Sequence, residues 1–139
     1  MTALKTGQIQ RTYVVADRGD RPAARGWFHL VAAALSAISS AVLITFGWMT
    51  LPWPQALGVT TYGAGVVLLF AVSAMYHLWP WRSVEAVQWW RRADHATISV
   101  FIAATYTPLC LIVFEPHTAA IMLAVAWAGG ISGAVLNLV

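Results

Sequence analysis

The chain has 139 residues, of which 60% are hydrophobic and only 9% are charged. Soluble domains are about 45–50% apolar and about 25% charged, so this composition excludes an ordinary soluble domain. The net charge of +3 does not indicate a nucleic-acid-binding protein, because five of the eight basic residues precede the first apolar segment and the other three lie in one loop. The composition predicts an all-α integral membrane protein.

The chain begins with a polar, basic segment, residues 1–26, in which Gly19 and Pro22 disfavour a helix. No cleavable signal peptide is predicted, because this segment is too long and polar for the n-region of one. We interpret residues 1–26 as a cytoplasmic tail and residues 27–139 as a transmembrane helical domain.

The first two spans follow from an uninterrupted apolar stretch. No Lys, Arg, Asp or Glu lies between Arg25 and Arg82, and charge-free stretches above about 18 residues are typical of spanning helices. The prolines of the segment 50–54 cannot continue a helix and therefore indicate a turn. Spans are predicted at about 27–49 and 56–78.

Two further spans are predicted at about 95–114 and 118–139, separated by a turn at Glu115-Pro116-His117. Segment 82–92, which mixes tryptophans with charges, is predicted to be a separate amphipathic interfacial helix. The last span ends without a polar or basic anchor, which favours a chain truncated at its C-terminus. The fold class is a polytopic helix bundle in a cell membrane.

Orientation follows from the basic residues, which are retained on the cytoplasmic side of membrane proteins. Five lie in the tail and three in loop 79–94, whereas segments 50–55 and 115–117 contain none. The tail and loop 79–94 are therefore predicted to be cytoplasmic. This topology places His77 and Asp94 near the same membrane face.

Ser73, His77 and Asp94 are the main candidates for a functional site. Ser73 and His77 are four residues apart and share one face of a helix, and ionisable residues at membrane depth commonly carry function. A histidine, a carboxylate and a hydroxyl are suited to holding a metal ion and its water.

Each candidate also has a purely structural interpretation. His77 is either a zinc ligand or an interfacial histidine that reaches the lipid headgroups. Asp94 either assists proton transfer or caps the third helix, and Ser73 is either part of the site or a packing residue. Catalytic zinc usually has three protein ligands, so His77 requires partners from elsewhere.

The other histidines are weaker candidates. His29 lies near the cytoplasmic start of the first span and is either a contributor or an interfacial residue. His95 points about 100° away from Asp94 on a helix, and His117 is predicted on the opposite side of the membrane. Gly129 and Gly133 form a Gly-x-x-x-Gly pair that allows close helix approach.

The only cysteine, Cys110, lies in an apolar segment, so an internal disulfide is impossible. Burial in apolar surroundings disfavours the thiolate, so we interpret Cys110 as a core residue without reactivity.

Four segments together resemble the haemolysin III family, the bacterial branch of the progestin and adipoQ receptor superfamily, which is distantly similar to alkaline ceramidases. They are RPAARGWFHL at 21–30, SAMYH at 73–77, RRADH at 91–95 and IAATYTP at 102–108. The resemblance extends from about Arg21 to the end of the chain.

The resemblance implies a seven-helix membrane protein with a zinc ion held by three histidines near the cytoplasmic face. His77 matches the ligand of the second helix, Asp94 the carboxylate that contacts the water on the zinc, and Ser73 the associated serine. The other two ligands belong to a His-x-x-x-His motif on a seventh helix, which this chain does not contain.

Two classes of function remain open. One is a zinc-dependent membrane hydrolase of lipid amides, such as a ceramide-like substrate, with Asp94 assisting proton transfer. The other is a non-enzymatic membrane protein with structural zinc, either cytolytic and pore-related or a receptor-like regulator. The sequence does not define the substrate or the oligomeric state.

Overall fold

The structure, a computed structural model, describes residues 21–139, which form four long helices and no strand. The helices are α2 (Ala23–Thr50), α3 (Trp53–Leu78), α4 (Val84–Val113) and α5 (Pro116–Leu138). Each is long and apolar enough to cross a membrane. This confirms the predicted all-α membrane fold with four spans; the predicted structure of residues 1–20 lies outside the described part.

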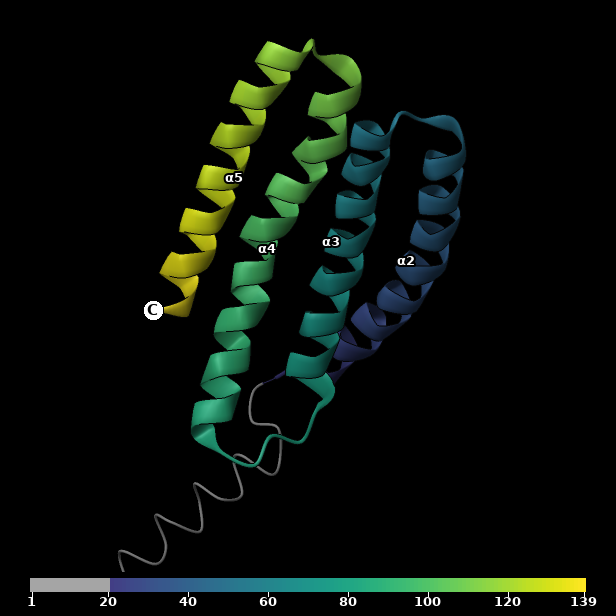
Figure 1. Cartoon of the computed structure of the whole chain (residues 1–139). Helices are drawn as coiled ribbons and strands as arrows, with labels where there is room; N and C mark the ends of the chain where they lie inside the picture. Colours follow the sequence, from purple (N-terminus) through teal and green to yellow (C-terminus); the bar gives the residue numbers. More distant parts are fainter. Residues whose placement is uncertain (1–20) are drawn as a thin grey trace, which may run out of the picture.

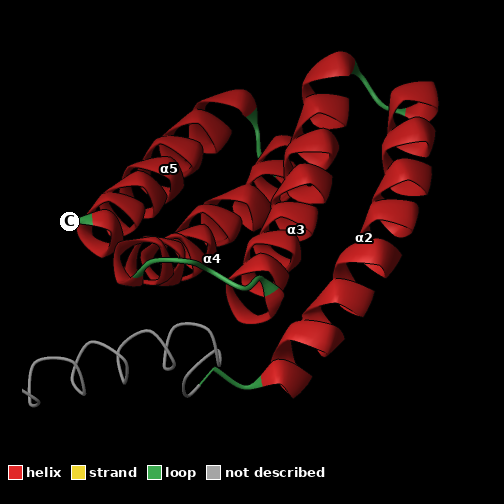
Figure 2. Ribbon diagram, turned by 90° about the horizontal axis from the view of Figure 1, so that it is seen from below, coloured by secondary structure: helices red, strands yellow, loops and turns green. Residues whose placement is uncertain are grey.

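The helices lie side by side in chain order and alternate in direction (Figures 1 and 2). Within the described residues, the extensive contacts are those between consecutive helices, α2 with α3, α3 with α4 and α4 with α5. The α2–α3 and α4–α5 turns lie at one end of this row, and the α3–α4 loop lies at the other (Figure 1). Residues from three helices therefore meet at the end that carries the α3–α4 loop.

Helix α4 is longer than the sequence predicts, because it runs without a break from Val84 to Val113. The predicted separate interfacial helix at 82–92 is therefore wrong, and most of that segment is the first part of α4. Ser83 caps the helix, since its Oγ accepts a hydrogen bond of 3.2 Å from the backbone N–H of Ala86. Asp94 lies well inside α4, so the alternative in which it caps the third helix is also wrong.

Small residues line the contact between α2 and α3. The buried residues of α2 are Gly26, Ala33, Ser40 and Gly47, which recur every seven positions. A seven-residue repeat keeps one face of a helix against its neighbour, and small residues allow the two backbones to approach closely. Ser40 also donates a hydrogen bond of 3.3 Å from its Oγ to the backbone carbonyl of Gly63 on α3.

Larger apolar residues cover the surfaces that face away from these contacts. Ile38 and Phe46 on α2 and Val125 on α5 are more than 60% exposed. Such surfaces are stable when hydrocarbon covers them, because lipid chains replace the apolar neighbours that a soluble protein would need. The arrangement places small residues between helices and large residues toward lipid.

The contact between α4 and α5 corrects one sequence prediction. A Cβ atom added to Gly130 would lie 2.8 Å from the Cβ of Ala103 and 3.0 Å from the backbone oxygen of Ser99. One added to Gly133 would lie 2.7 Å from the Oγ of Ser99, whereas one added to Gly129 would meet no atom within 4 Å. The pair that permits close approach is therefore Gly130 and Gly133, and Gly129 is not part of it.

The adjacent residues Gly129 and Gly130 provide a matched test of the α4–α5 contact. We expect Gly130→Ala to lower the free energy of unfolding by about 1–3 kcal/mol, the usual cost of inserting a methyl group into a well-packed contact. Gly129→Ala places its methyl group in open space and should be neutral or slightly stabilising, because alanine favours a helix. Denaturant titration of both variants in the same detergent measures the difference. Equal stability of the two variants would contradict this packing.

Glu115 forms the N-terminal cap of α5 in the turn after α4. Its carboxylate accepts hydrogen bonds from the Oγ1 of Thr118 at 2.5 Å, the backbone N–H of Thr118 at 2.8 Å and that of His117 at 3.0 Å. These bonds, the one from the Thr118 hydroxyl first, favour the charged carboxylate and lower the pKa of Glu115 below its ordinary value of 4.5.

This cap predicts a pH dependence of stability. A carboxyl group whose pKa is lower in the folded state stabilises the fold above its unfolded pKa, and that contribution is lost as the pH falls through the folded pKa. We expect Glu115→Gln to lower the melting temperature at pH 7. This gap in melting temperature between variant and wild type should narrow as the pH falls below about 4. Thr118→Val, which removes one of the three donors, should show a smaller gap. A gap that does not change with pH would rule out the ionised cap.

Candidate functional site

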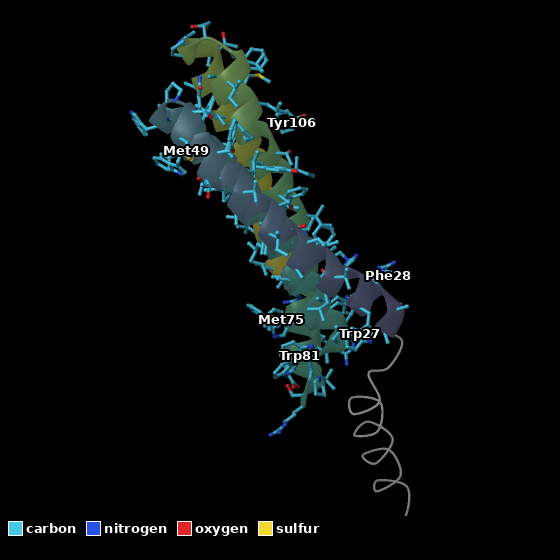
Figure 3. All side chains as sticks on the ribbon, turned by 90° about the vertical axis from the view of Figure 1, so that its right-hand side faces the viewer. Trp27, Phe28, Met49, Met75, Trp81 and Tyr106 are labelled. Carbon is cyan, nitrogen blue, oxygen red and sulfur yellow. The ribbon has the colours of Figure 1, made fainter. Side chains whose placement is uncertain are left out.

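The candidate site lies where α2, α3 and α4 meet, at the end of the row that carries the α3–α4 loop. Figure 3 shows Trp27, Phe28, Met75 and Trp81 toward this end of the molecule and Met49 toward the other. Tryptophan is enriched at the interface between hydrocarbon and headgroups. The site therefore lies close to one membrane surface rather than at the centre of the bilayer.

Gly26 sets the approach of α2 to this end of α3. A Cβ atom at residue 26 would lie 2.8 Å from the Cβ of His77 and 2.7 Å from the side chain of Leu78. Only glycine leaves room for this contact without a shift of one helix. His29 lies three residues further along α2, about one helical turn, so it faces the same neighbour.

His29 forms a hydrogen bond with Ser73, with 2.6 Å between its Nδ1 and the serine Oγ. Its ring also lies 5.5 Å from the ring of Phe70 and 6.4 Å from that of His77, measured between centroids and with edge-on geometry. Ser73 is buried at 5% exposure. The hydrogen bond connects the first and second spans inside the apolar region.

His77 is the most unusual residue of the site, because it is 3% exposed and neither ring nitrogen has a hydrogen-bond partner among residues 21–139. Its nearest aromatic neighbour is Tyr76, at 4.8 Å between ring centroids. A buried polar group without a partner costs free energy and is uncommon in folded proteins. The two nitrogens of His77 are therefore available to bind a ligand that is not among the described residues.

Asp94 interacts electrostatically with His77, as do Arg25, His29 and Arg21. Asp94 is half-buried on α4, so α4 brings a carboxylate toward the histidine that α3 provides. The sequence predicts from topology that these two residues lie near the same membrane face.

Arg21 closes the site from the side of the chain that precedes α2. Its guanidinium donates hydrogen bonds to the backbone carbonyls of Tyr76 at 2.7 Å and Trp79 at 3.4 Å, and it lies 5.8 Å from the centre of the Tyr76 ring. A cation at the C-terminus of a helix satisfies its last carbonyls and favours its dipole. Arg21 thereby holds the end of α3 next to His77.

The remaining histidines do not join this group. His95 is exposed, and its Nδ1 lies 2.8 Å from the backbone oxygen of Arg91, one turn earlier on α4. His117 lies in the first turn of α5, at the opposite end of the row. Across residues 21–139, no group of three or more His, Cys, Asp or Glu side chains is arranged to hold a metal ion.

One feature of the site, the contact between His29 and Ser73, was not evident from the sequence. The contact between His29 and Ser73 depends on the rotation of α2 about its axis, which hydropathy does not define. The seven-residue repeat of small residues that starts at Gly26 is the signal that would have indicated it, since this repeat marks the face of α2 that packs on α3.

A comparison with models of protein families matches residues 19–139 to the family described as haemolysin-III related. The match includes all four helices and every residue of the candidate site. The chain belongs to the haemolysin-III related family. It is accordingly a multi-pass integral membrane protein whose environment is a lipid bilayer. No solved structure matches the chain.

Membership of the haemolysin-III related family agrees with the resemblance carried by the four sequence segments. His29, Ser73, His77 and Asp94 all come from those segments, and the fold brings them to one end of the molecule. The chemical roles of Ser73, His77 and Asp94 stay predictions.

Proposed function

We propose that this protein acts as a zinc-dependent membrane hydrolase of lipid amides. In this proposal His77 is a zinc ligand, and Asp94 and Ser73 act on the substrate. The observation that carries this proposal is the buried imidazole of His77, whose two ring nitrogens have no hydrogen-bond partner in the described part of the chain. A neutral imidazole is a preferred ligand of zinc, and a ligand on one nitrogen would remove part of the cost of burial.

The residues fit zinc in part. His77 would supply one ligand, whereas catalytic zinc usually takes three from the protein. The described residues do not group three His, Cys, Asp or Glu side chains around one position, so at least two further ligands are required. Zinc held there would supply Lewis-acid polarisation of the amide carbonyl.

Asp94 is suited to move the proton. Its carboxylate is half-buried on α4 and interacts with His77, so it would accept a proton from the attacking water and later release it to the amide nitrogen of the leaving group.

Ser73 is suited to orient the substrate, with His29 as its positioning residue. When His29 carries a proton on Nδ1, it donates to the Oγ of Ser73, which then keeps its own proton for donation to the substrate. The hydrogen bond of 2.6 Å fixes the serine hydroxyl on the face of α3 that also presents His77.

Zinc content tests the role of His77. We expect the 139-residue chain, purified in detergent, to contain zinc well below one equivalent, because a single imidazole leaves most of the metal shell to solvent. If the gene encodes further helices that supply two more histidine ligands, the longer product should hold about one equivalent and lose it in His77→Ala. His95→Ala is the matched control at the same end of the molecule and should keep its zinc. Stoichiometric zinc in the 139-residue chain, or in the His77→Ala variant, would show that the ligands are misplaced.

Hydrolysis of an N-acyl sphingoid amide by the zinc-loaded protein tests the reaction. Loss of a general base typically lowers turnover by about 10²–10⁴-fold, and we expect Asp94→Asn to fall in that range while it retains zinc. Glu85→Gln, a neutral substitution of the other acidic residue of α4, should leave the rate unchanged. If zinc is present and wild type shows no zinc-dependent amide hydrolysis, the metal is structural and the non-enzymatic alternative is preferred.

We also propose that the end bearing the site faces the cytoplasm. All the arginines of the described residues lie at this end, and the turns at the opposite end contain no Lys or Arg. These arginines are Arg21, Arg25, Arg82, Arg91 and Arg92. A single cysteine introduced at Thr50, in a Cys110→Ala background, should react with a membrane-impermeant maleimide added outside intact cells. One introduced at Ser83 should react only after the cells are opened. The reverse pattern would overturn the orientation.

A further inference from the structure

A cluster of tryptophans fastens the α3–α4 loop to the side of α4. The rings of Trp81 and Trp90 are stacked, with 4.8 Å between centroids and 22° between planes. Trp89 meets Trp90 edge-on at 5.2 Å, and Trp79 lies 6.3 Å from Trp81. The Nε1 of Trp81 also donates to the backbone carbonyl of Tyr76 at 3.4 Å. The loop is therefore held in one position instead of extending freely from the membrane.

An arginine follows each of the two stacked tryptophans in the sequence. Arg82 follows Trp81 in the loop, and Arg91 follows Trp90 on α4, so the stacking brings two segments with cationic side chains together. Both arginines are exposed, and within residues 21–139 neither side chain has a hydrogen-bond or ion-pair partner. Glu85, the acidic residue of the first turn of α4, pairs with neither of them.

The position of this surface relative to the membrane defines what it meets. Trp81 follows the C-terminal end of α3, and Trp90 lies near the start of α4. Tryptophan rings are enriched at the level of the lipid headgroups. Guanidinium groups at that depth lie next to phosphates, which they bind through two parallel N–H donors. Arg25 on α2, also exposed, adds to the positive charge of the same end.

We propose that Arg82 and Arg91, held in place by the stacked rings of Trp81 and Trp90, form a binding surface for the headgroups of anionic phospholipids. Charge complementarity selects the occupant, because a zwitterionic headgroup offers the two cations no net negative charge. The opposite end of the helices carries no Lys or Arg in its turns, and it has the exposed carboxylate of Glu115 instead. The surface is independent of zinc and of any hydrolytic reaction.

Native mass spectrometry of the detergent-purified chain, titrated with phosphatidylglycerol or with phosphatidylcholine of the same acyl chains, tests this surface. Each basic residue near a membrane surface strengthens binding of anionic lipid by about fivefold. We therefore expect wild type to bind phosphatidylglycerol more tightly than phosphatidylcholine. Arg82→Gln and Arg91→Gln should each weaken the first by several-fold, and the double variant should weaken it further.

The controls separate charge from fold and lipid from free phosphate. Lysine at both positions retains the charges and should keep most of the preference, and Gln88→Ala, an uncharged change on the same helix, should keep all of it. Binding of phosphatidylcholine should be unchanged throughout, which reports on the fold. Equal affinity of wild type for the two lipids, full affinity in the double glutamine variant, or displacement of the lipid by millimolar inorganic phosphate would overturn the proposal.

Discussion

The contact of Gly26 with His77 and Leu78 is the constraint on which the site depends. Lipid chains are as apolar as leucine, so helices in a bilayer are not driven together by the hydrophobic effect and associate through close packing and hydrogen bonds. At Gly26 a single methyl group would overlap the side chains of α3, and small residues continue the same seam every seven positions along α2. Because the helices approach this closely, His29 reaches Ser73 across the contact.

The polar chemistry of the molecule is separated along the membrane normal. One end combines the buried His77 and the half-buried Asp94 with most of the charges of the described chain, and tryptophans stack around the loop that closes it. The other end holds little more than a carboxylate that caps a helix. A buried imidazole without a partner destabilises the fold, so its retention next to a carboxylate and a hydrogen-bonded serine is the feature that favours function over packing.

Hydropathy predicted the four spans, prolines indicated the turns between them, and the distribution of basic residues predicted the shared end of His77 and Asp94. The start of α4 was not predicted, because Arg91, Arg92 and Asp94 interrupt the apolar run although the helix continues through them. Hydropathy indicates which residues lie in the membrane, whereas the cap at Ser83 indicates where the helix begins. The choice of Gly130 over Gly129, and the pairing of His29 with Ser73, depend on the rotation of each helix about its axis. That rotation is set by packing between helices; hydropathy does not indicate it, and for α2 only the seven-residue repeat of small residues does.

The hydrogen bond between His29 and Ser73 can be measured directly in a bilayer. Solid-state NMR of the chain with ¹⁵N in histidine rings and ¹³C at serine Cβ detects pairs separated by less than about 4 Å, the separation that a hydrogen bond from Oγ to a ring nitrogen imposes. We expect dephasing of one serine signal, and loss of that dephasing in both Ser73→Ala and His29→Phe. Absence of any short histidine–serine distance, or its persistence in Ser73→Ala, would contradict the packing of α2 on α3 and the site built upon it.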